Sequence, residues 1–156
     1  MDLKLILTNQ ILICAAVSWF VAQSIKIILV LLKKRDSYSN KDLVLHALFG
    51  TGGMPSSHTA TVTAISISIG LKQGFDSALF ALSVIFLSVV FRDATGVRLA
   101  SGKQAVTINR IIDSINTGDL EGVKKIKEVK GHTLLESLVG SIIGLIVTLI
   151  FCSFYL

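Results

Sequence analysis

The sequence predicts an all-α protein, a polytopic membrane bundle of about four transmembrane helices with one short re-entrant or interfacial helix. Hydrophobic residues make up 52% of the 156 residues and charged residues only 16%, whereas soluble domains carry about a quarter charged residues. The mean hydropathy is +0.74. The net charge of +5 would suit nucleic acid, but the long uncharged runs favour a lipid bilayer as the partner and predict no nucleic-acid binding. The length predicts one domain over residues 1–156.

Four apolar runs approach the roughly 20 residues that a helix needs to cross a bilayer core. The first, Leu5–Leu32, is too long for the apolar part of a signal peptide, so we expect a retained transmembrane helix. The runs Ser56–Leu71 and Ser77–Phe91 are shorter, and we expect these helices to extend past the runs or to pack inside the bundle. Gly131–Leu156 is the fourth predicted span, and Leu43–Gly50 is too short to cross.

Positive charge gathers on one predicted side of the membrane. The loop after the first run is basic, as is the long segment between the third and fourth runs, whereas the other side holds only Lys4 and Lys72. The positive-inside rule then places both termini outside and both basic segments in the cytoplasm, most simply in a plasma membrane. The same cations can also belong to a substrate site, in which case their position would not indicate the side of the membrane.

Four polar sites, distant in the chain, meet at one membrane depth in this topology. Lys26 lies near the inner end of the first span, His58 opens the second, Arg92 and Asp93 end the third, and His132 opens the fourth. Ionisable groups at the borders of spans are costly and usually mark function or mutual pairing. We therefore expect one polar site at the cytoplasmic membrane interface. Taken alone, Lys26 would be read as a lysine that snorkels to the headgroups.

The motif "PSSHT" predicts a helix N-terminus. Pro55 suits the first turn of a helix, and Ser56, Ser57 and the amides that follow form an anion site because their N–H groups are unpaired and the helix dipole is positive there. The alternative is a serine cap followed by an interfacial histidine, His58.

Arginines occupy two positions near the end of the third run. Arg92 and Arg98 can each bind a phosphate through the planar guanidinium fork. Alternatively, both anchor the helix on the positive side, with Asp93 paired to a neighbour. The sequence leaves these alternatives open.

His132 and Glu136 are four residues apart and share a helix face. A carboxylate beside an imidazole fixes its tautomer and raises its basicity. Gly140, Gly144 and Thr148 continue the same stripe, which predicts close approach of a neighbouring helix and leaves a homo-oligomer open.

The remaining histidine and the two cysteines are predicted to be structural. His46 lies in a short apolar segment without polar neighbours. Cys14 and Cys152 lie in apolar runs and match neither a metal site nor a disulfide framework.

Together these residues suit phosphoryl transfer, which needs cations and amides for the phosphoryl oxygens, a nucleophile, and an acid for the leaving oxygen. The sequence has no acidic cluster typical of a metal site, so we expect neither a metal nor another cofactor.

Four stretches, "GGMPSSHTATV", "DATGVR", "KQAVTIN" and "GHTLLESLVGSIIG", resemble in this order the divergent branch of the type-2 phosphatidic acid phosphatase superfamily. That branch is related to acid phosphatases and vanadium-dependent haloperoxidases. The resemblance runs from about Lys26 to Gly144. It implies hydrolysis without a metal, with His132 as the nucleophile that forms a phosphohistidine and His58 as the general acid.

The sequence departs from the superfamily motifs at several positions. Ser57 stands where the second motif has glycine, and Glu136 stands where the third has aspartate. The arginine of the third motif is missing, because Ile126 occupies its position, so Arg92 or Arg98 would supply the guanidinium from elsewhere. Lys26 is the candidate for the first-motif lysine.

The expected function is hydrolysis of a phosphate monoester, with a diphosphate as the alternative, on a lipid or isoprenoid at the membrane. Glu136 would support the nucleophile, and Asp93 would support the cations. The alternatives are a membrane protein that binds or transports a lipid phosphate without turnover, and a small scaffold whose histidines cap helices. The residues expected to hold the phosphate are Lys26, Ser56, Ser57, Arg98 and Arg92.

Overall fold

The computed structural model describes residues 3–32, 53–115, 124–126, 128 and 131–155. These residues form helices and, among them, no strand. The predicted all-α membrane bundle is therefore confirmed. The short helix expected at Leu43–Gly50, with His46, lies outside the described residues.

The first predicted span is two helices rather than one. Helix α1 covers Leu3–Leu7 and α2 covers Gln10–Leu32. The side chain of Asn9 accepts hydrogen bonds from the backbone N–H groups of Ile11 and Leu12, at 3.0 and 3.4 Å. Because an asparagine that bonds these amides caps a helix, the chain restarts at this residue instead of continuing from Leu5.

Helix α4, Ser57–Gln73, lies at the centre of the bundle and contacts α2, α5 and α7. Ser56 is its N-cap, so Pro55 precedes the cap and does not lie in the first turn as the sequence suggested. With 17 residues, the helix is about 26 Å long at 1.5 Å per residue, slightly less than a bilayer core. The expectation that this short run packs inside the bundle is confirmed.

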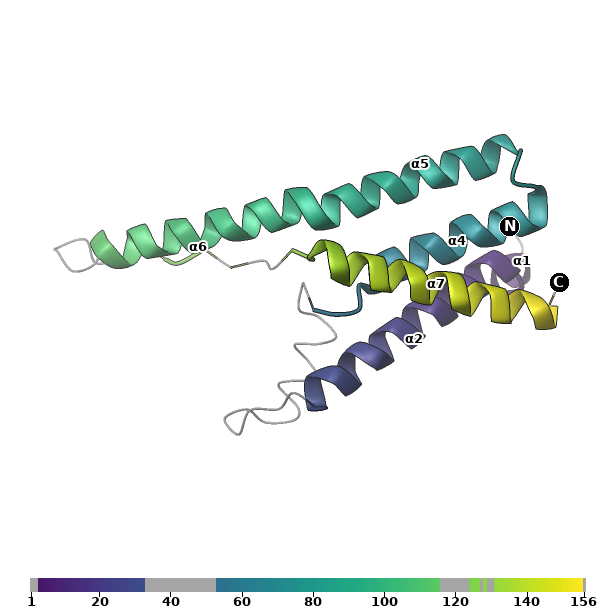
Figure 1. The fold of residues 1–156 in the computed structure, drawn as a ribbon, viewed down its shortest axis with the longest axis horizontal. Coiled ribbons are helices and arrows are strands. Elements are labelled where there is room, and N and C mark those ends of the chain that lie inside the picture. Colours follow the sequence, from purple (N-terminus) through teal and green to yellow (C-terminus); the bar gives the residue numbers. More distant parts are fainter. Residues whose placement is uncertain (1–2, 33–52, 116–123, 127, 129–130, 156) are drawn as a thin grey trace.

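The third run continues into a helix that leaves the bundle (Figure 1). Helix α5, Ala78–Arg92, is followed by a π-helical turn, η1, at Asp93–Val97 and then by α6, Arg98–Ile115. The helical segment Ala78–Ser114 has 37 residues, or about 55 Å. The helix of the run Ser77–Phe91 thus extends past the apolar residues, which is one of the two outcomes expected for the shorter runs.

Helix α7 covers Leu134–Tyr155 and begins three residues later than the predicted span. It packs along α4 through its small residues. A Cβ atom on Gly140 would clash with the backbone oxygen of Ser56, and one on Gly144 with that of Ala60. The small-residue stripe therefore predicted the right face of this helix.

Hydroxyl groups tie the helices together within the bundle. Thr59 Oγ1 donates to the carbonyl of Ser137 at 3.0 Å, and Ser18 Oγ donates to the carbonyl of Ala60 at 3.2 Å. Such bonds satisfy polar side chains where no water is present. Both cysteines are free thiols, and Cys14 contacts Thr148 instead of forming a disulfide.

Among the described residues, three helical segments are long and apolar enough to cross a membrane: Gln10–Leu32, Ala78–Ser114 and Leu134–Tyr155. Helix α4 falls just below that length. In the described part of the chain, three helices that are long and apolar enough to span thus surround a shorter central helix, close to the expected number of about four.

Candidate functional site

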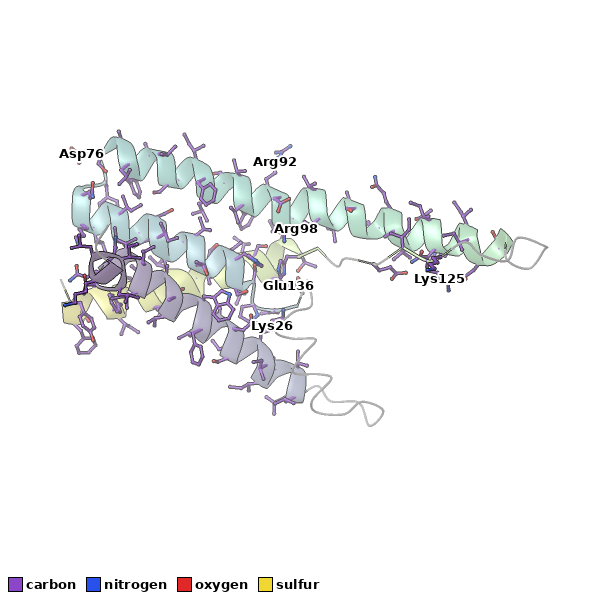
Figure 2. The ribbon with its side chains drawn as sticks, turned by 180° about the vertical axis from the view of Figure 1, so that it is seen from behind. Lys26, Asp76, Arg92, Arg98, Lys125 and Glu136 are labelled. Carbon is purple, nitrogen blue, oxygen red and sulfur yellow. The ribbon has the colours of Figure 1, made fainter. Side chains whose placement is uncertain are left out.

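The predicted polar residues gather at one end of the bundle. Figure 2 shows Lys26, Arg98 and Glu136 near this end, whereas Asp76 lies at the opposite end of α4 and α5. The residues come from α2, the start of α6 and the first turn of α7. Because the segments are distant in the chain, the helix packing alone brings them together.

A cavity of about 420 Å³ lies at this end of the bundle. Its polar lining includes His58, Asp93, Arg98 and His132. Two imidazoles and one guanidinium therefore face the same space, from α4, from α6 and from the residues before α7. This volume is within the usual range of ligand pockets.

His132 is held in place by backbone contacts. Its N–H donates to the carbonyl of Ala94 at 3.0 Å, and the preceding Gly131 lies so close to α6 that a Cβ would overlap the backbone of Leu99. The histidine precedes α7 rather than opening it, and it is 7% exposed. The π-helical turn and the start of α7 are thus fixed against each other next to the cavity.

Glu136 belongs to a capping box that the sequence analysis missed. The N–H of Thr133 donates to Oε2 of Glu136 at 2.9 Å, and the N–H of Glu136 donates to Oγ1 of Thr133 at 3.3 Å. The pattern Thr-x-x-Glu before an apolar run is the sequence signature of this motif. It explains why α7 begins at Leu134.

The same carboxylate lies beside His132. Oε2 of Glu136 is 3.5 Å from Nδ1 of His132, which is in ion-pair range but too long for a good hydrogen bond. Nδ1 is buried and has no hydrogen-bond partner among the described residues. The predicted pairing of His132 with Glu136 is therefore a close contact in which the carboxylate is shared with the helix cap.

Burial lowers the pKa of His132 from its ordinary value of 6.5. The carboxylate of Glu136 opposes this change, whereas the Lys26 ammonium and the His58 imidazole add to it. His132 is therefore neutral at pH 7, the state in which an imidazole is a nucleophile.

Arg98 and Asp93 form an ion pair across the π-helical turn. Nε of Arg98 is 2.7 Å from Oδ2 of Asp93, and the N–H of Arg98 bonds to the carbonyl of Asp93. The wide turn brings residues five apart onto one side of the helix. Because Asp93 binds only Nε, the two terminal nitrogens of the guanidinium remain for a ligand in the cavity.

Lys26 is 6% exposed on α2. A Cβ on Gly53 would lie 3.1 Å from Cε of Lys26, and Gly53 has a φ of +91°. Glycine therefore allows the chain before α4 to approach this lysine closely. Lys26 does not line the cavity itself, but its charge acts on His132.

Ser56 and Ser57 form the buried start of α4. The N–H of Ser56 donates to the carbonyl of Glu136 at 3.1 Å, and its Oγ accepts from Thr59 at 3.5 Å. Neither serine lines the cavity. Because they form the start of α4, the two serines fix the position of the next residue, His58, and of the positive end of the helix dipole.

Among the predicted phosphate-binding residues that do not line the cavity, Arg92 is the one that is not buried. Its side chain is exposed and, in Figure 2, extends from the side of α5 away from the other helices. It does not line the cavity. The sequence left open which of the two arginines binds phosphate. Of the two, Arg98 is the one that lines the cavity together with both histidines.

The apolar part of the cavity was not anticipated. Its walls include Trp19 from α2, Val62 from α4, and Phe86, Val89 and Val90 from α5. Trp19 is the single tryptophan of the chain. Nothing in its local sequence separates it from the other apolar residues of α2.

Comparison with known proteins identifies the family. The family model described as the divergent PAP2 family matches residues 7–147. The uncharacterized membrane protein YuiD of Bacillus subtilis (strain 168) is 36% identical over 162 residues, covering 97% of this chain and 99% of that protein. No solved structure shows a significant match. This integral membrane protein therefore belongs to the divergent PAP2 family.

Proposed function

We propose that the protein hydrolyses the phosphate ester of a lipid or isoprenoid through a phosphohistidine on His132. The observation that carries this proposal is the single cavity that His58, His132 and Arg98 line together. A nucleophile, an acid and a phosphate-binding cation are the groups that phosphoryl transfer requires. Membership of the family supports a phosphatase-like function.

In the first step, Nε2 of His132 attacks phosphorus and the bond from phosphorus to the ester oxygen breaks. Nδ1 carries the proton in this tautomer, next to the carboxylate of Glu136. Burial and the charges of Arg98 and Lys26 lower the pKa of His58, so its free imidazole is mainly neutral at pH 7 and takes a proton from the entering phosphate monoester. His58 then gives this proton to the leaving oxygen, so that an alcohol departs. The negative charge of the phosphoryl group is stabilised by Arg98, by the nearby Lys26 and by the positive end of α4.

In the second step, water attacks the phosphohistidine. His58, now neutral, takes a proton from the water, and the bond between phosphorus and Nε2 breaks. His58 passes this proton to the departing phosphate, and both histidines return to their starting states. Asp93 keeps Arg98 beside the cavity, and Arg92, which is directed away from it, has no step in this proposal.

The test is phosphate release by the purified protein in lipid nanodiscs, with a panel of single-chain, two-chain and isoprenoid phosphates. We expect His132→Ala to abolish release and the covalent phosphoryl label, and His58→Ala to lower kcat by about 10²–10⁴-fold. A double variant that still releases phosphate at the wild-type rate would disprove the mechanism.

A second candidate function is binding or transport of a lipid phosphate without turnover. The observation in its favour is Glu136, whose Oε2 accepts from Thr133 at 2.9 Å and lies 3.5 Å from His132. A carboxylate shared in this way supports the imidazole less strongly than a dedicated partner would. Saturable binding of vanadate with no release from any member of the panel would favour this function.

A further inference from the structure

The cavity changes in character along the bundle axis. At one end it is lined by His58, Asp93, Arg98 and His132, and its remaining walls are apolar apart from Thr61. A phosphate fills only the polar end. A ligand that fills the whole cavity must therefore place an apolar portion in the remaining part.

Three helices place the apolar residues progressively farther from the charged end. Trp19 follows Ser18 on α2, whose Oγ donates to the carbonyl of Ala60 at 3.2 Å, so Trp19 lies beside the first turn of α4. Phe86 lies deeper, since it precedes Asp93 by seven residues on α5. Seven residues are two helical turns, or about 10 Å. Val62 follows His58 by four residues on α4, which runs in the opposite direction, so it lies one turn from the charged end.

The two aromatic side chains stand on different helices that both pack on α4. Trp19 and Phe86 are 42% and 55% exposed, so the cavity walls are not sealed by protein. In a membrane these exposed surfaces face lipid, and a hydrocarbon chain reaches the cavity sideways without crossing water. Together with Val62, Val89 and Val90, these two side chains form an apolar lining, which suits a hydrocarbon chain.

We propose that the apolar part of the cavity is a subsite for one hydrocarbon chain, with Trp19 and Phe86 as the residues that select it. This inference rests on the proposed function only in placing the phosphate at the charged end. About 420 Å³ lies towards the lower end of ligand pockets, and the phosphate occupies part of it. The ligand class is therefore a single-chain alkyl or isoprenoid phosphate rather than a two-chain phospholipid.

The test uses Trp19 as the probe, because no other tryptophan contributes to the fluorescence. Liposomes containing the protein are titrated with dodecyl phosphate that carries bromine near the phosphate end of the chain, since bromine quenches tryptophan on contact. Dodecanol with the same bromine is the matched control, because it partitions into the bilayer but lacks the phosphate. Binding is measured without turnover, so this experiment does not depend on phosphate release.

We expect the phosphate to quench Trp19 more strongly than the alcohol, and unlabelled dodecyl phosphate or inorganic phosphate to reverse the excess. Bromine near the phosphate end should quench more than bromine at the far end of the chain, because Trp19 lies beside the first turn of α4. Equal quenching by the alcohol and the phosphate would overturn the subsite. Displacement by a two-chain phosphatidic acid at the same concentration as by dodecyl phosphate would overturn the single-chain assignment.

A pair of neighbouring variants tests the wall on α5. Phe86→Ala should weaken binding of dodecyl phosphate by up to about tenfold, because a large apolar contact is lost. Ile85→Ala removes an equally accessible apolar side chain that does not line the cavity, and it should leave the binding curve unchanged. Equal effects of the two variants would overturn the role of Phe86.

Discussion

At the scale of single residues, the site depends on a few side chains that are held by their neighbours. Arg98 is fixed by Asp93 through Nε, and His132 by its N–H bond to Ala94. Held side chains lose less entropy when a ligand binds, which favours recognition of a small anion. The predictions at this scale therefore concern the guanidinium and the imidazole.

Replacement of Arg98 by lysine should weaken vanadate binding by about tenfold or more, because lysine cannot present two parallel N–H groups to one anion. Arg92→Lys makes the same chemical change on the outer side of α5 and should have little effect, as the side chain lies off the cavity. Calorimetry with vanadate measures both. The opposite ranking would assign the phosphate to Arg92.

The imidazole of His132 should titrate below pH 6.5, because its burial disfavours the charged form. Glu136→Gln removes the group that opposes this shift, so the pKa should fall further. Because the pKa of His132 is lower in the folded state than in the unfolded state, the unfolded state binds the proton more tightly. Protonation of His132 should therefore lower the free energy of unfolding only as the pH falls below about 6.5. Nitrogen NMR of labelled histidine follows the titration, with His132→Ala to assign the signal. A rise in the pKa of the Glu136→Gln variant would contradict this account.

At the scale of elements, the contact between α4 and α7 sets the distance between the two histidines. His58 stands in the first turn of α4, and His132 just before α7. Gly140 and Gly144 let the two helix backbones approach. The sequence revealed this contact face because glycines four residues apart are a strong local signal.

Gly144→Ala should lower the free energy of unfolding by about 1–3 kcal/mol, because the added methyl group overlaps the backbone of α4 and cannot be relieved by a rotamer change. Gly96→Ala is the matched control, since a Cβ at Gly96 would have no atom within 4 Å. It should be neutral or slightly stabilising. Unfolding in mixed micelles compares the two, and equal losses would argue against a close helix contact.

The π-helical turn is the element that the sequence could not show. In a regular α-helix, residues five apart point in different directions, so "DATGVR" gave no reason to pair Asp93 with Arg98. The widened turn aligns them. π-turns frequently occur at functional sites, and here the turn also offers the carbonyl of Ala94 to His132.

At the scale of the whole molecule, α6 extends beyond the bundle (Figure 1) and carries basic residues away from the site. Asn109 holds the later segment against α6 by bonding the N–H and carbonyl of Ile126, at 2.8 and 2.9 Å. Lys125 pairs with Asp113 at 2.7 Å. Lys125 lies far from the cavity (Figure 2), so its charge indicates orientation independently of substrate binding.

We predict that this basic end faces the cytoplasm and that both termini lie outside. In a variant without its two cysteines, Lys125→Cys should react with a membrane-impermeant maleimide only after cells are permeabilised. Asp76→Cys, at the opposite end of α4 and α5, should react in intact cells. The reverse pattern would invert the proposed orientation.

The sequence by itself determined the class of the protein, its apolar helices and the residue types of the site. Hydropathy and small-residue spacing act locally, so they can be read along the chain. The tertiary structure decided which arginine joins the histidines, that Glu136 also caps α7, and that Trp19 and Phe86 line the cavity. These features depend on which faces of distant helices meet and on the widening of one helix turn. Neither the meeting of helix faces nor the wide turn can be read from the order of residues along the chain.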